Sequence, residues 1–149
     1  MTTSVGMQAE FHDALYALCE LDFDAVEAYK TAIDRLESVI YQQHLSEFMA
    51  DHKRHIENIT SILREHQKES PTSPDIKQYL TKGKIILANI FCDKAILKAM
   101  LTNEIDTTKA YETVSNHANK WPEATALIMQ GLKDEKRHKE WLEAVIEEQ

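Results

Sequence analysis

The chain has 149 residues, and only 3 of them are Gly and 3 are Pro, about a third of the share that an average chain carries. So few chain breakers, with 43 % hydrophobic and 28 % charged residues, exclude a hairpin-rich β protein and an α/β fold and favour one all-α domain over residues 1–149. The net charge of −8 argues against nucleic-acid and membrane partners, and no secretory leader or membrane span is seen, so we expect a cytoplasmic protein that can bind metal cations.

The first two helices are predicted from apolar stripes with alternating spacings of three and four residues. One stripe runs from Leu15 to Leu36, and the next runs from Leu45 to Ile62. The second stripe is out of phase with the first by two residues, about 200° around a helix, so one straight rod cannot keep both on one side. We therefore predict a turn within residues 37–44, although no Gly or Pro marks it. The second helix should then run to about residue 67.

A long connection is predicted in the middle of the chain. Residues 68–75, KESPTSPD, hold two of the three prolines and read as a loop that continues through residues 76–83. A third helix follows from about Lys84 to Ala118, and Pro122 suits the first turn of a fourth helix. Two short turns and one long crossover are typical of an up-down four-helix bundle.

The two halves of the sequence resemble each other. Tyr29 recurs 82 residues later as Tyr111, and DHKRH at residues 51–55 recurs 83 residues later as DEKRH at residues 134–138. Two repeated helical hairpins related by a pseudo-twofold axis would bring equivalent positions together at the centre of the bundle. The Lys-Arg pair of each segment is expected to form salt bridges with acidic neighbours.

Each predicted stripe is interrupted near its middle by side chains that can ligate a metal ion. These side chains are Asp22, His52, His55, Glu104, Glu135 and His138. The two pairs on the second and fourth helices are spaced i, i+3, which places both members of a pair on one helical face. Burying three carboxylates in one layer is very costly unless cations neutralise them. Oxygen and imidazole ligands suit iron, manganese or zinc, so we predict a site for two divalent ions, iron or manganese first.

Other readings of these residues remain open. The same side chains would also suit a polar layer of carboxylate–histidine pairs that fixes helix register and binds nothing. Tyr29 and Tyr111 are either core aromatics or donors to a ligating carboxylate of the other half. Glu20, Asp24 and Glu27 point away from the stripe and are expected on the solvated face.

On these residues the sequence resembles the ferritin-like superfamily, and within it the rubrerythrin- and bacterioferritin-type di-iron carboxylate bundles, over about residues 9–147. That family carries a Glu on its first and third helices and Glu-x-x-His on its second and fourth. The positions that match are His55, Glu104, Glu135 and His138. Asp22 stands in the place of the first-helix Glu, and His52 replaces the second-helix Glu.

The resemblance implies a protein that binds iron and reacts it with oxygen or peroxide, as a homodimer rather than a cage. The paired CxxC motifs of rubrerythrins are absent from this sequence, so an electron donor would be a separate protein. With His52 in place of Glu, two divalent ions and three carboxylates leave a net charge of +4 − 3 = +1, which leaves a mononuclear or non-iron site open.

Two further functions remain open, and whether the protein is an enzyme stays undecided. One is a degenerate bundle without redox activity that acts as a structural or interaction module. The other, weaker one is a bundle that binds a small ligand or haem between subunits, for which Met49, Met100 and Met129 are the candidates.

Overall fold

The structure is a computed structural model that describes residues 3–73 and 92–148. These residues form helices and no strand. The helices are α1 (Phe11–Arg35), α2 (Val39–Glu65), α4 (Asp93–Ser115), the short 3₁₀ helix η2 (Pro122–Ala124) and α5 (Thr125–Glu147). The prediction of an all-helical protein with four long helices is confirmed, as is the helix start at Pro122.

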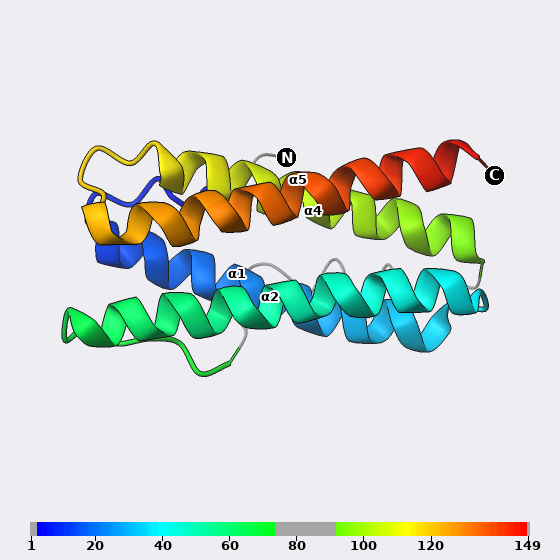
Figure 1. The fold of residues 1–149 in the computed structure, drawn as a ribbon, viewed down its shortest axis with the longest axis horizontal. Helices are drawn as coiled ribbons and strands as arrows, with labels where there is room; N and C mark the ends of the chain where they lie inside the picture. Colours follow the sequence, from blue (N-terminus) through cyan, green and yellow to red (C-terminus); the bar gives the residue numbers. More distant parts are fainter. Residues whose placement is uncertain (1–2, 74–91, 149) are drawn as a thin grey trace.

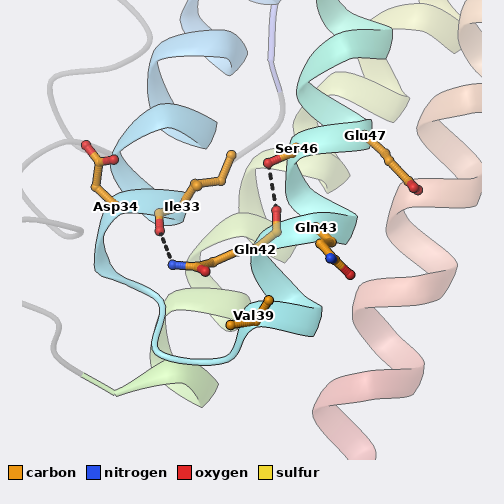
Figure 2. Close-up of a pocket in the computed structure, with 7 residues that line it drawn as sticks. All are labelled: Ile33, Asp34, Val39, Gln42, Gln43, Ser46 and Glu47. Atoms are coloured by element: carbon orange, nitrogen blue, oxygen red, sulfur yellow. Dashed lines mark hydrogen bonds between the residues drawn. The ribbon is translucent and has the colours of Figure 1, made fainter.

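A turn without Gly or Pro joins α1 to α2. The Ser38 side chain caps α2 by accepting a hydrogen bond from a backbone N–H of the first turn at 3.3 Å. The Gln42 side-chain amide reaches back and donates to the carbonyl oxygens of Ile33 at 3.2 Å and Leu36 at 2.9 Å. Figure 2 shows the bond from Gln42 to Ile33 beside a surface pocket. The turn comprises residues 36–38, so it begins one residue before the predicted window of 37–44, and residues 39–44 of that window lie in α2.

Contacts at the two ends of the bundle fix the directions of the helices (Figure 1). At one end, the Asp93 carboxylate at the start of α4 accepts hydrogen bonds from the backbone N–H groups of Glu37 at 2.9 Å and Ser38 at 3.0 Å. At the other end, His66 just after α2 pairs with Glu123 just before α5. It follows that α2 and α4 run in the same direction and that α1 and α5 run opposite to them.

The predicted crossover lies mostly outside the described residues, since these omit residues 74–91. The predicted start of the third helix at Lys84 lies outside them as well. The predicted end of that helix at Ala118 is wrong, because α4 ends at Ser115 and Ala118 is exposed. The side chain of Asn116 donates to a carbonyl oxygen of the last helical turn at 3.0 Å and so ends the helix there.

The end of α2 also has a local cause. Gln67 adopts a left-handed backbone conformation with φ of 58°. The next N–H, that of Lys68, then bonds to the carbonyl of Leu63 at 2.8 Å, and the N–H of Gln67 bonds to that of Arg64 at 2.9 Å. This Schellman pairing satisfies the last carbonyls and ends α2 at Glu65, two residues before the predicted end.

The apolar core divides into two clusters, one toward each end of the bundle. Members of the first cluster include Leu15, Leu18, Ile59, Leu63, Val114, Ile128 and Leu132. Members of the second include Ala32, Leu45, Phe48, Leu97, Met100, Leu142 and Val145. On each of the four long helices the predicted ligand residues lie between the segments that contribute to the two clusters. We call these six residues the polar layer: Asp22, His52, His55, Glu104, Glu135 and His138.

Candidate metal centre

All six predicted ligands come together in the polar layer, and each is between 0 % and 4 % exposed. They form two groups of four whose ligand atoms lie within 4.8 Å of one another. The first group is Asp22, His52, His55 and Glu135; the second is His52, Glu104, Glu135 and His138. Because the groups share His52 and Glu135, they are two adjacent positions at which a metal ion could be held.

Two aspartates that the sequence reasoning did not single out orient the histidines. The Nε2 of His55 on α2 lies 2.8 Å from Asp134 on α5, and the Nε2 of His138 on α5 lies 2.8 Å from Asp51 on α2. Each Nε2–H donor therefore leaves the Nδ1 of the same ring facing the polar layer. A carboxylate behind a histidine is the usual partner of a metal-ligating imidazole, because it fixes the tautomer and raises the basicity of the ring.

Two arginines form salt bridges with these aspartates, both within a helix and between α2 and α5. Arg54 pairs with Asp51 on its own helix at 2.9 Å and with Asp134 on α5. Arg137 pairs with Asp134 at 3.1 Å and with Asp51 on α2 at 2.6 Å. The expected salt bridges of the repeated segment are thus confirmed for both arginines. The repeat itself was the signal that could have identified the aspartates, since each occupies the first position of the repeated segment, four residues before a histidine of the layer on its own helix.

The two tyrosines donate to carboxylates of the opposite half. Tyr111 on α4 donates to Asp22 on α1 at 2.7 Å, and Tyr29 on α1 donates to Glu104 on α4. Both rings are also buried in the core, so the two readings of the tyrosines hold together. Thr107, which the sequence reasoning missed, adds hydrogen bonds that the first half lacks, because Ala25 stands at its equivalent position.

His52 lies between the carboxylates of both halves. Its Nδ1 is 2.8 Å from Oδ1 of Asp22, and its Nε2 is 3.2 Å from Oε1 of Glu104. Glu135 is also near, with Oε1 at 3.4 Å from Nδ1 of His52. The ring therefore occupies the middle of the layer, between Asp22 of the first half and the two glutamates of the second half.

Burial disfavours the charged form of every group in the layer. For the histidines, the nearby carboxylates outweigh burial and raise the pKa. Burial alone would lower the pKa of His55, yet hydrogen bonds to nearby carboxylates raise it to about 12. The pKa of His138 is raised to about 9 because Glu104 and Glu135 outweigh its burial. Burial and the charge of Glu104 together raise the pKa of Glu135. In the absence of an ion, protonated imidazoles thus balance the carboxylates.

Two buried atoms of the layer have no hydrogen-bond partner among the described residues. They are Nδ1 of His138 and Oε1 of Glu135. Oε1 of Glu135 carries lone pairs, Nδ1 of His138 carries one once the ring gives up its proton, and an unpaired buried polar atom costs about 1–3 kcal/mol. A bound cation would satisfy both atoms, and three imidazoles with three carboxylates form a donor set that suits iron, manganese or zinc. The residues present therefore fit a divalent transition metal ion.

The three acidic residues expected on the solvated face of α1 differ in their burial. Glu20 and Glu27 are half-buried, and Asp24 is only 2 % exposed, so the expectation for Asp24 is wrong. The cause is that α1 packs against both α2 and α4, which buries a wider arc of α1 than a single stripe. Among the methionines named for a ligand between subunits, Met100 is a core residue and Met129 is exposed.

Comparisons with known proteins agree with the helical fold and carry no function. Within the described residues, no helix is long and apolar enough to cross a membrane. No curated protein matches the chain. The crystal structure of a conserved hypothetical protein, rv2844, from Mycobacterium tuberculosis is similar, with a TM-score of 0.75 and 12 % sequence identity over 93 % of this chain and 98 % of that chain. At this identity the similarity shows the fold alone. The family described as a domain of unknown function, DUF2383, matches residues 10–117, and the chain therefore belongs to the DUF2383 family.

Proposed function

We propose that this protein is a ferritin-like bundle that binds a divalent transition metal in its polar layer, iron or manganese first and zinc as the alternative. One observation carries the proposal: His55 and His138 each present Nδ1 to a cluster of buried carboxylates while an aspartate at 2.8 Å holds the other nitrogen. A carboxylate that holds one ring nitrogen while the other faces buried carboxylates is the usual arrangement of a metal-ligating imidazole.

The arrangement of the helices supports the ferritin-like part of the proposal. A bundle of this kind has one long connection between its second and third helices, which makes those two helices parallel. In this chain α2 and α4 run in the same direction, and the equivalent carboxylates Asp22 and Glu104 each accept a hydrogen bond from the tyrosine of the other half. His52 departs from the ferritin-like pattern, which has a glutamate at this position.

The roles of the residues follow from their contacts. Glu104, Glu135 and the histidines would hold the ion, and Tyr29 and Tyr111 would orient carboxylates by donating to one oxygen of each. Iron bound there would supply a redox-active centre able to exchange electrons with oxygen or a peroxide. The two apolar clusters on either side would shield the layer from bulk water.

A second function is favoured by one observation. The His52 ring already bonds to Asp22 and Glu104 and, when protonated, supplies a positive charge to both. A layer neutralised in this way could fix helix register and bind no metal, which would make the protein a structural or interaction module.

Metal binding separates the two functions. Protein purified from cells supplied with iron, manganese and zinc is analysed for metals, and chelator-treated protein is titrated with each ion. An ion present at 100 times its dissociation constant should stabilise the fold by about 2.7 kcal/mol, which raises the melting temperature by roughly 5–11 °C. The variant His138→Ala should lose this stabilisation, whereas His12→Ala, a histidine outside the layer, should retain it. Absence of bound metal together with an unchanged melting temperature for every ion would refute the proposal and favour the metal-free layer.

A further inference from the structure

We infer that the polar layer holds one divalent ion rather than two, bound by His52, Glu104, Glu135 and His138, and that Asp22 orients His52 instead of binding the ion. This inference rests on the proposed function and makes it specific. It depends on His52, which stands where the ferritin-like pattern has a glutamate.

All three histidines of the layer have the same kind of partner. An aspartate lies 2.8 Å from one nitrogen of each ring: Asp134 for His55, Asp51 for His138 and Asp22 for His52. In this set Asp22 has the same part as the two outer aspartates. In the metal-free ring Nδ1–H of His52 donates to Asp22 and Nε2–H donates to Glu104. Loss of the Nε2 proton would keep the bond to Asp22 and leave the Nε2 lone pair for an ion held with Glu104.

Asp22 has a short side chain whose two oxygens both have hydrogen-bond partners. Both of its oxygens accept well-formed hydrogen bonds, Oδ1 from His52 at 2.8 Å and Oδ2 from Tyr111 at 2.7 Å. Its side chain is also one methylene shorter than that of Glu104, the equivalent residue of the other half. Both oxygens of Glu104 also accept hydrogen bonds, from Tyr29 and Thr107, so it is the shorter side chain that makes Asp22 better placed to hold His52 than to reach an ion.

The second group of four contains the imidazole nitrogen that makes no hydrogen bond. Nδ1 of His138 lies 3.4 Å from Oε1 of Glu104, its neighbour in that group, but has no hydrogen-bond partner among the described residues. The equivalent Nδ1 of His55 lies 3.4 Å from Oδ1 of Asp22, in a weak hydrogen bond. An ion in the second group would use the nitrogen that has no other partner.

The number of ions follows from the donors of His52. A neutral imidazole has one N–H donor and one lone pair. If the donor serves Asp22 and the lone pair serves the second group, the first position keeps only Asp22, His55 and Glu135, and Glu135 is shared with the ion. A glutamate at position 52 would have two oxygens and no proton to place, so it could serve both positions.

Titration of the chelator-treated full chain with Mn²⁺ tests the inference, with the stoichiometry read by elemental analysis after dialysis and the spin state by electron paramagnetic resonance. We expect one Mn²⁺ per chain with the spectrum of an isolated ion, and two per chain with an exchange-coupled spectrum in His52→Glu. Two coupled ions in the wild type would overturn the inference and leave the proposed function intact. No ion bound by the wild type, with Fe²⁺ and Zn²⁺ also tested, would overturn both.

The two equivalent histidines supply a matched pair of variants, so the test does not depend on the folding of His52→Glu. His138→Gln should lower Mn²⁺ affinity by more than about 100-fold, beyond the range typical of an outer partner. His55→Gln should lower it by no more than that range and keep one ion per chain. Circular dichroism checks that both variants are folded. An equal loss in the two variants, or a larger loss in His55→Gln, would contradict the assignment to the second group.

Discussion

Replacing Asp51 with Asn removes the negative charge behind His138 and keeps the size of the side chain. Asp51 Oδ2 lies 2.8 Å from Nε2 of His138 and 2.6 Å from the guanidinium of Arg137. A hydrogen bond to a charged group contributes about 1.5–3 kcal/mol and a neutral one about 0.5–1.5, so the free energy of unfolding of the metal-free protein should fall by about 1–2 kcal/mol. Metal affinity should fall about 10- to 100-fold, or about 1.4–2.7 kcal/mol, because a less basic imidazole binds the ion.

Asp134→Asn is the matched control for this prediction. Asp134 has the same relation to His55 that Asp51 has to His138, with the same 2.8 Å separation. Both variants should lose similar stability in urea unfolding with chelator present, but only Asp51→Asn should weaken Mn²⁺ binding strongly in calorimetric titration. Wild-type affinity in a destabilised Asp51→Asn protein would refute the role of the Asp–His pair in supporting a ligand. Equal affinity losses in the two variants would mean that the ion contacts both histidines.

Three further predictions follow from the surroundings of the layer. In Gly131→Ala the added Cβ would collide with the Tyr111 ring, and the clash should cost about 1–3 kcal/mol, enough to cancel the gain of about 1 kcal/mol in helix propensity. A variant about 1 kcal/mol more stable than the wild type in urea unfolding would contradict this packing. Tyr111→Phe leaves Oδ2 of Asp22 without its donor and should lower the free energy of unfolding by about 1–3 kcal/mol, whereas an unchanged value would argue against that bond. Mn²⁺ affinity should rise with pH, by about tenfold per unit for each proton released, because the raised pKa of about 9 keeps His138 protonated at neutral pH without the ion. In the metal-free protein the same raised pKa contributes stability that is fully present below pH 6.5 and is lost as the pH rises through about 9, so thermal unfolding with chelator should show the opposite trend to binding.

The six residues of the polar layer could be predicted because helical periodicity is a local property of the sequence. An ionisable residue in an apolar stripe must face the core, and the repeat of residues 51–55 in residues 134–138 places the two halves at one level. The structure brings all six together for this reason. Burial of Asp24 could not be predicted in the same way, since it depends on α1 having two neighbours.

The partners of those residues depend on which helices face each other. Asp51 and Asp134 point at histidines of the opposite helix, and this pairing requires α2 and α5 to run antiparallel side by side. Thr107 is also invisible to periodicity, because a threonine on a helix face has no signal that separates a ligand-orienting hydroxyl from an ordinary one. The short turn at Ser38 was located only approximately, since it is formed by side-chain caps.

Anomalous X-ray scattering from crystals of the metal-loaded protein, recorded across the iron, manganese and zinc edges, tests most directly whether the polar layer binds a metal ion. We expect a strong anomalous peak inside the bundle, in contact with Glu104, Glu135 and His138, and its edge identifies the metal. A polar layer with no anomalous peak at any of the three edges, in protein that had been saturated with each ion, would contradict the claim that this layer is a metal centre.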